Sequence, residues 1–284
     1  MAMVLYERGF LDLEAPVAGM VPEFSAASDV RRNKVTLRML LAHSSGLSAH
    51  EKFYLRAKTK QELLQAAFTT PLAADPGIRA EYSDIGFIVL GVALERLADT
   101  TLEEFCRAEF AKLGISQTGF NPPASLRTSI VPTANDTTFR KRIIQGEVYD
   151  ENASVLGGAA PHAGLFAPAQ DVATFANILL QGGPPLVRRG TLALFTRREL
   201  EPVGTSRALG WDTPSSPSQS GKYFSPSSFG HLGYTGTSLW IDPQRQLSVT
   251  LLTNRTWPDS SNQAIKRIRP PFHNAVIEAL EISH

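Results

Sequence analysis

The 284-residue sequence contains little cysteine, no surplus of charge of either sign and no long apolar run. Its single cysteine, Cys106, excludes an internal disulfide and any metal site built from several cysteines. The 28 Lys and Arg residues nearly balance the 27 Asp and Glu residues, so nothing in the composition predicts a nucleic-acid partner or an anionic membrane surface. Hydrophobic residues make up 43% of the chain and charged residues 19%, which supplies a large core and argues against disorder of the whole chain.

The patterns of a signal peptide and of a membrane span are also missing. Residues 1–12 include Glu7, Arg8 and Asp12, and no basic stretch precedes an apolar run there. The most apolar stretch, residues 85–94, is well short of the roughly 18 apolar residues that suggest a transmembrane helix. We therefore expect no membrane segment in this chain, and its length predicts one or two domains.

Hydrophobic spacing predicts an α+β protein whose first two thirds are mostly helical. Thr36 and Thr101 are candidate N-caps, because a threonine oxygen can accept a hydrogen bond from the first turn of a helix. Residues 119–160 hold many Pro, Asn, Thr and Gly and are predicted to be mainly loop. The predicted helices are residues 1–8, 36–42, 60–68, 85–97, 101–113, 169–181, 191–198 and 271–282.

The last third of the sequence changes to strand-like composition. Residues 238–241 and 247–254 are apolar and β-branched, and the turn-forming residues 242–245 lie between them, which predicts an antiparallel hairpin. Residues 230–234 are predicted to form a strand leading into it. Pro271 is expected in the first turn of the terminal helix.

Tyr82, Ser83 and Asp84 stand directly before the predicted helix at residue 85. A tyrosine at a helix start can act as a general base or proton shuttle, because the positive end of the helix favours phenolate. The alternative is a loop tyrosine that covers the core, with Asp84 capping the helix.

Residues 231–236, His-Leu-Gly-Tyr-Thr-Gly, enter the predicted hairpin. A glycine on a strand lets a ligand approach the backbone closely, and a neighbouring polar group such as His231 can bind a substrate carboxylate. The alternative is a bulge with a surface histidine. The substrate-binding candidates are Gly233, Tyr234, Thr235 and Gly236.

A third segment, residues 40–47, places His43 beside Ser44. The pair suggests a nucleophile and its base, but neighbours in sequence seldom have catalytic geometry. A turn that ends a helix explains Ser45 and Gly46, so we favour a structural role.

In this order the segments resemble the serine β-lactamase and penicillin-binding-protein superfamily, in its class C-like esterase and D-alanyl carboxypeptidase branch. Residues 36–47 and 157–166 are similar to segments of that branch. Residues 82–84 resemble its Tyr-x-Asn motif, and residues 231–233 resemble its Lys-Thr-Gly or His-x-Gly motif.

The resemblance implies an α+β fold, an antiparallel sheet flanked by helices with a mostly helical inserted domain. Residues 1–35 and 186–284 would form the sheet domain, which would be incomplete, and residues 36–185 the helical domain. The implied partner is a small-molecule or peptide substrate, and no nucleic acid, metal or organic cofactor is implied.

Two departures from the family pattern bear on activity. The family nucleophile lies in Ser-x-x-Lys, and no serine here is followed three residues later by lysine. In the family that motif precedes a segment similar to residues 5–13, so we expect the nucleophile and the first strands of the sheet to be missing from a truncated chain. Asp84 stands where the wider family has Asn, and an ionised Asp cannot donate a hydrogen bond to a β-lactam. Ester and peptide substrates remain open.

For an intact relative the resemblance implies acyl transfer through an acyl-serine, with Tyr82, Asp84 and His231 at the catalytic site. Tyr82 would return a proton to the leaving group, a backbone N–H after Gly233 would stabilise the oxyanion, and His231 would help place a substrate carboxylate. Losing the nucleophile costs on the order of 10⁶ in rate. The alternative is a non-catalytic binding protein that retains the cleft.

Overall fold

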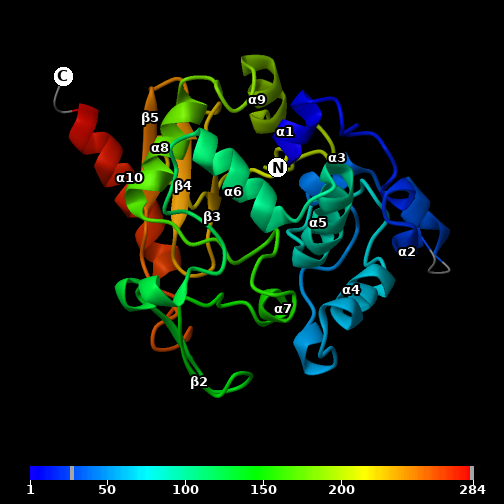
Figure 1. Ribbon diagram of the computed structural model, residues 1–284. Coiled ribbons are helices and arrows are strands. Elements are labelled where there is room, and N and C mark those ends of the chain that lie inside the picture. The colour runs from blue at the N-terminus through cyan, green and yellow to red at the C-terminus, as the bar shows by residue number, and fades with distance from the viewer. Residues whose placement is uncertain (26–28, 282–284) are drawn as a thin grey trace.

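The computed structural model describes residues 1–25 and 29–281 and combines helices with antiparallel strands, which confirms the predicted α+β class (Figure 1). Its helices are α1 (Ala2–Glu7), α2 (Pro22–Ser25), α3 (Leu37–Leu41), α4 (Lys60–Thr69), α5 (Asp84–Ala98), α6 (Leu102–Lys112), α7 (Glu151–Val155), α8 (Ala169–Leu180), α9 (Arg189–Thr196) and α10 (Ile265–Glu281). Its strands are β1 (Pro132–Asp136), β2 (Arg142–Gln145), β3 (Phe229–Leu232), β4 (Ser238–Asp242) and β5 (Leu247–Leu251).

The main sheet has the strand order β3-β4-β5, and both pairings are antiparallel. Side chains alternate between its two faces. Trp240 and Val249 pack with Ile277 of α10 on one face, whereas Ile241 joins the main core. Helix α8 contacts β4 and β5, and Figure 1 shows α8 and α10 beside the sheet. The predicted hairpin of residues 238–254 is therefore confirmed, with its first strand extended to Asp242 and its second ending at Leu251.

The most apolar helix, α5, lies at the centre of the helical part. The side chain of Ser83 caps it by accepting a hydrogen bond from the Gly86 N–H. The helix contacts α1, α3, α4 and α6, so it needs apolar residues on nearly all sides. Thr36 and Thr101 cap α3 and α6 as predicted.

The prediction of a loop over residues 119–160 is wrong in part, because β1, β2 and α7 lie within it. The hairpin β1–β2 carries polar residues such as Thr133 and Asp136 at buried positions. Its hydrophobic alternation is therefore weak, and side-chain hydrogen bonds hold it instead.

The terminal helix begins at Ile265 rather than near Pro271, so Pro270 and Pro271 lie inside it. The predicted last residue of that helix, Ile282, lies outside the described residues. Pro270 has no N–H for the carbonyl of Lys266 one turn earlier. The Gln219 side chain donates to that carbonyl over 3.0 Å instead, which shows how the helix tolerates the proline.

Helix α8 belongs to residues 36–185, the predicted helical domain, but it packs on strands β4 and β5 of the predicted sheet domain. The division itself stays a prediction. Within the described residues, no helix has the length and apolar character needed to cross a membrane.

Candidate active site

Tyr82 stands two residues before the start of α5, and its ring lies between the rings of two histidines. Its ring centroid is 4.6 Å from that of His43 and 6.0 Å from that of His231, and the Arg207 guanidinium lies 5.8 Å from the Tyr82 ring centre. The structure thus brings together two predicted residues that are far apart in sequence. Their catalytic roles stay predictions.

The Tyr82 phenol is held in its neutral form. Burial raises its pKa, and the negative charge of Asp84 adds to that effect, while Arg207 acts weakly in the opposite direction. The predicted phenolate is therefore disfavoured in this chain, and the protonated phenol can donate a proton.

The His43 ring lies next to the Tyr82 ring, and His43 is buried. Its Nδ1 accepts a hydrogen bond from the Ser83 N–H over 3.1 Å, and its ring stacks on Phe87 with centroids 4.5 Å apart. Burial lowers its pKa well below 6.5, and Arg207 and His231 lower it further. His43 is therefore a neutral imidazole with its proton on Nε2.

His231 sits on β3, opposite Leu239 of β4. Its Nδ1 is 2.9 Å from the Leu232 carbonyl oxygen and donates to it, which leaves Nε2 as an acceptor. Burial and the charge of Arg207 lower the pKa of His231. A neutral His231 cannot attract a carboxylate by charge, so Arg207 is the cation of this cluster.

The turn between β3 and β4 uses its glycines internally. A Cβ on Gly233 would lie 2.0 Å from Thr237 Oγ1, and one on Gly236 would lie 2.5 Å from Thr253 Oγ1. The Gly233 N–H donates to the Thr237 carbonyl. At both glycines the space that a Cβ would need is taken by a threonine hydroxyl of the protein. The sequence pattern instead predicts that a ligand approaches the backbone there.

Two features of the same turn remain available to a ligand. The Tyr234 N–H makes no hydrogen bond within the part of the chain that the structure describes. The Tyr234 side chain is 60% exposed, and its ring stacks on Tyr149 and lies 4.0 Å from the Arg255 guanidinium. Thr235 holds the turn through its carbonyl, which accepts from the Arg255 N–H.

Asp84, which also acts on the pKa of Tyr82, belongs to a second polar cluster. Its Oδ2 is 3.2 Å from His50 Nδ1, and this contact raises the pKa of His50. Asp150 lies close by, 3.2 Å from His162 Nε2. His162, from the segment of residues 157–166, makes the pKa of Asp150 lower than usual although burial acts to raise it.

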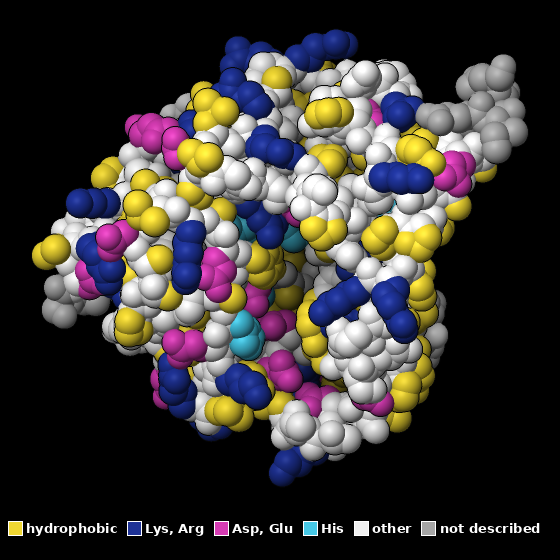
Figure 2. Space-filling view, turned by 180° about the vertical axis from the view of Figure 1, so that it is seen from behind, with side chains coloured by type: hydrophobic (Ala, Val, Ile, Leu, Met, Phe, Trp, Pro, Cys, Tyr) yellow, Lys and Arg dark blue, Asp and Glu magenta, His cyan; other side chains and the backbone are white. Residues whose placement is uncertain are grey.

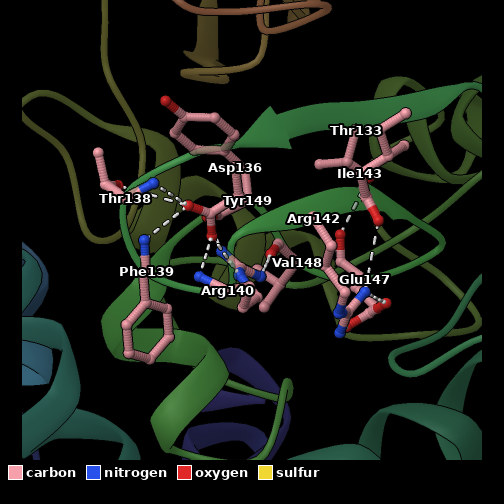
Figure 3. A network of polar contacts seen from close by, with 10 residues as sticks. All are labelled: Thr133, Asp136, Thr138, Phe139, Arg140, Arg142, Ile143, Glu147, Val148 and Tyr149. Atoms are coloured by element: carbon pink, nitrogen blue, oxygen red, sulfur yellow. Dashed lines mark hydrogen bonds and ion pairs between the residues drawn. The ribbon is translucent and has the colours of Figure 1, made fainter.

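A hydrogen-bond network holds the segment before Asp150 (Figure 3). Asp136 accepts from the N–H groups of residues 138–140 and from Arg140 Nε. The Arg140 guanidinium in turn donates to the carbonyls of Val148 and Tyr149 over 2.6 and 2.7 Å. The β1–β2 hairpin therefore fixes the backbone that leads into Asp150.

The face opposite to that of Figure 1 is hollowed, and histidine, acidic and hydrophobic side chains meet in the hollow (Figure 2). A hollow with such a mixture of polar and apolar side chains suits a polar organic ligand.

A family model described as Beta-lactamase matches residues 1–269. The chain belongs to the beta-lactamase family. Among its relatives are proteins of Salmonella agona (strain SL483) and Salmonella typhi named "Putative D-alanyl-D-alanine carboxypeptidase". Each is 29% identical over 293 residues, which cover 92% of this chain and 67% of the relative.

Several solved structures share the fold of this chain. EstCE1, described as a hydrolase with promiscuous acyltransferase activity, matches with a TM-score of 0.71 at 22% identity, over 94% of this chain and 80% of that one. A penicillin-binding protein homologue from Caulobacter crescentus matches with a TM-score of 0.71 at 18% identity, over 96% and 79%. These likenesses confirm the predicted β-lactamase/transpeptidase-like fold.

Four residues of this candidate site were missed or given another role in the sequence. His43 was assigned a structural turn, while His50, Asp150 and Arg207 belong to no motif that was recognised. One sequence signal could have pointed to two of these residues, because His43 and His50 both lie in the short segment that follows α3. Arg207 stands in an irregular segment that no periodicity marks.

Proposed function

We propose that the cluster of residues around Tyr82 binds the carbonyl substrates of a serine hydrolase, namely esters, amides or peptides, and serves acyl transfer when a serine nucleophile is supplied. The observation that carries this proposal is the position of Tyr82 between His43 and His231, with Arg207 beside it. Membership of the beta-lactamase family supports the reaction class.

Each group has a role that follows from its state. The protonated Tyr82 returns a proton to the leaving group, since its raised pKa keeps the phenol intact. The unpaired Tyr234 N–H is a donor for the oxyanion. The Arg207 guanidinium attracts a carboxylate of the substrate.

The substrate class to test first is a peptide that ends in D-alanyl-D-alanine. The name of the Salmonella relatives supports this choice, and the free carboxylate of such a peptide suits Arg207. The chain spans about two thirds of the length of those relatives, and no Ser-x-x-Lys occurs in its 284 residues. We therefore infer that this chain alone binds such a peptide without cleaving it.

The test combines a reactive probe with a binding measurement. We expect no covalent adduct by intact-mass measurement after incubation with a fluorophosphonate or a reactive β-lactam. We also expect saturable binding of a D-alanyl-D-alanine peptide by calorimetry. A stoichiometric adduct on any serine would show that the chain carries its own nucleophile, and a peptide that does not bind would remove the proposed substrate.

A second candidate is a non-catalytic binding protein that retains the family cleft. The absence of Ser-x-x-Lys favours it. The coding sequence directly upstream of Met1 separates the two, because an in-frame Ser-x-x-Lys there supports the serine hydrolase and its absence supports the binding protein.

A further inference from the structure

We propose that His50, Asp84 and Asp150 form a binding site for a divalent transition-metal ion such as Zn²⁺, beside the Tyr82 cluster. One ligand atom from each of the three residues lies within 4.8 Å of the other two. The residues come from three separate parts of the chain, namely the turn before residue 51, the start of α5 and the residue before α7.

The spacing is close to that of a coordinated ion. His50 Nδ1 and Asp84 Oδ2 are 3.2 Å apart. Nitrogen and oxygen ligands at 2.0–2.1 Å from a tetrahedral zinc are about 3.3 Å from each other. Small side-chain rotations therefore convert the present hydrogen-bonded arrangement into a ligand set with one position left for water or substrate.

The two carboxylates are partly buried and lie close to each other. The side chains of Asp84 and Asp150 are only 17% and 20% exposed. Across residues 1–25 and 29–281 neither forms an ion pair with lysine or arginine, and each contacts a histidine instead. Two partly buried negative charges at this distance repel each other, and a dication removes the repulsion.

His162 gives an independent indication, because its side chain is 2% exposed and its Nδ1 has no hydrogen-bond partner among the described residues. Its Nε2 lies 3.2 Å from Asp150 Oδ1. His162 thereby orients the carboxylate of Asp150, as the hydrogen-bond partners of metal ligands do. Both hydrogen bonds that Asp150 makes within the described residues reach Oδ1, which leaves Oδ2 for an ion.

The backbone around the three ligands is fixed by hydrogen bonds. The Asp84 N–H donates to the Ala49 carbonyl, next to His50. The Asn152 side chain donates to the Glu51 carbonyl and accepts from the Tyr54 N–H, which joins the start of α7 to the segment after His50. Arg140 fixes the two residues before Asp150 (Figure 3). Such support is what a preorganised metal site requires.

The ligand types select the class of ion. An imidazole nitrogen suits zinc and its neighbours in the first transition row. Calcium prefers six to eight oxygen ligands, which three side chains, one of them a histidine, supply poorly.

The experiment uses the full chain after chelator treatment and dialysis, with ZnCl₂ as the probe and no substrate present. We expect one zinc per chain by equilibrium dialysis with elemental analysis, and a rise in unfolding temperature on addition of zinc. His50→Gln and Asp150→Asn should each weaken zinc binding at least about tenfold. Asn caps a helix as well as Asp does, so Asp150→Asn keeps the cap of α7 and should fold.

Asp75→Asn is the matched control, because Asp75 is an exposed carboxylate that pairs with Arg31 outside the cluster. It should bind zinc as the unaltered chain does. Three results would overturn the proposal: no bound zinc, equal affinities of the unaltered chain and Asp150→Asn, or displacement of zinc by CaCl₂ or MgCl₂ at equal concentration. Because the readout is bound metal, its failure leaves the proposed acyl-transfer site unaffected.

Discussion

At the residue scale, the neutral state of His43 links the site to the stability of the protein in acid. Its Nδ1 accepts from the Ser83 N–H, so protonation would remove an acceptor and place a charge near Arg207. The unfolded chain binds the proton more readily, because the pKa of His43 is lowered only in the folded protein.

The free energy of unfolding should therefore fall as the pH drops below about 6.5. We expect this decline, measured by urea unfolding between pH 8 and pH 5, to be steeper for the unaltered chain than for His43→Asn. Asparagine tolerates the positive φ of 56° at this position. His231 and His273 also have lowered pKa values and contribute to the same pH dependence. Both proteins contain these two histidines, so the difference between their curves reports on His43 alone. Parallel curves would contradict the assignment to His43.

Arg207 provides a second prediction at this scale. Arg207→Gln should weaken binding of a D-alanyl-D-alanine peptide about tenfold, since a hydrogen bond to a charged group is worth about 1.5–3 kcal/mol. The amide-capped peptide should bind equally to both proteins in calorimetry. Arg197→Gln, at an exposed arginine, is the control and should change neither affinity. Equal losses for the free and capped peptides would show that Arg207 does not recognise the carboxylate.

Sequence reasoning singled out Tyr82 and His231 because each lies in a motif with a recognisable neighbour. It could not locate Arg207 or Asp150, because their roles arise only when distant segments meet. It offered a phenolate at Tyr82 as one possibility, since the helix end is visible in the sequence while the burial that raises the pKa is not.

At the scale of elements, a buried carboxylate holds the hairpin β4–β5. Asp242 ends β4, and its oxygens accept from the N–H groups of Ser225, Gln244 and Arg245 and from the Ser225 hydroxyl. Burial acts to raise the pKa of Asp242, but these hydrogen bonds outweigh it and the pKa is lowered. One side chain thus joins the turn to the segment before β3.

We expect Asp242→Asn to lose about 2 kcal/mol at pH 7, because an amide cannot accept all these hydrogen bonds. A lowered pKa stabilises the fold above the unfolded value of 3.8 and stops doing so as the pH falls through the folded value. The difference in urea midpoint between the two proteins should therefore shrink between pH 7 and pH 3. A difference independent of pH would mean that the carboxylate charge is not what stabilises the turn.

The elements themselves were predictable where hydrophobic spacing was strong, as in α5 and in the hairpin of β4 and β5. The hairpin of β1 and β2 was missed because Asp136 and Arg140 hold it through polar contacts. The start of α10 was misplaced because Pro270 normally ends a helix, and the compensating Gln219 lies far away in the sequence.

At the scale of the whole molecule, the main sheet has an open edge. Strand β5 pairs only with β4 among the described strands. Unpaired N–H and C=O groups along an edge strand can pair with another chain. Leu252, directly after β5, is 43% exposed and adds apolar surface there.

We expect the chain to associate at high concentration, and Leu252→Lys to reduce that association, as measured by light scattering. Leu200→Lys is the matched control, since Leu200 is 84% exposed and lies outside β3, β4 and β5. A chain that stays monomeric at all concentrations, or equal effects of both substitutions, would argue against association through β5.

The buried Arg269 of α10 donates to the carbonyls of Gly233 and Thr237 over 2.6 and 2.8 Å. These carbonyls bracket the turn that carries the Tyr234 N–H, so the last helix of the described chain sets the shape of the turn. A ligand that moves this turn would also move α10. A fluorescent reporter attached to α10 would therefore detect such a ligand, and the reporter itself would lie outside the ligand site. A peptide selected to displace α10 would disturb the turn through Arg269 rather than through the Tyr82 cluster, which offers a route to inhibitors that need not resemble the substrate.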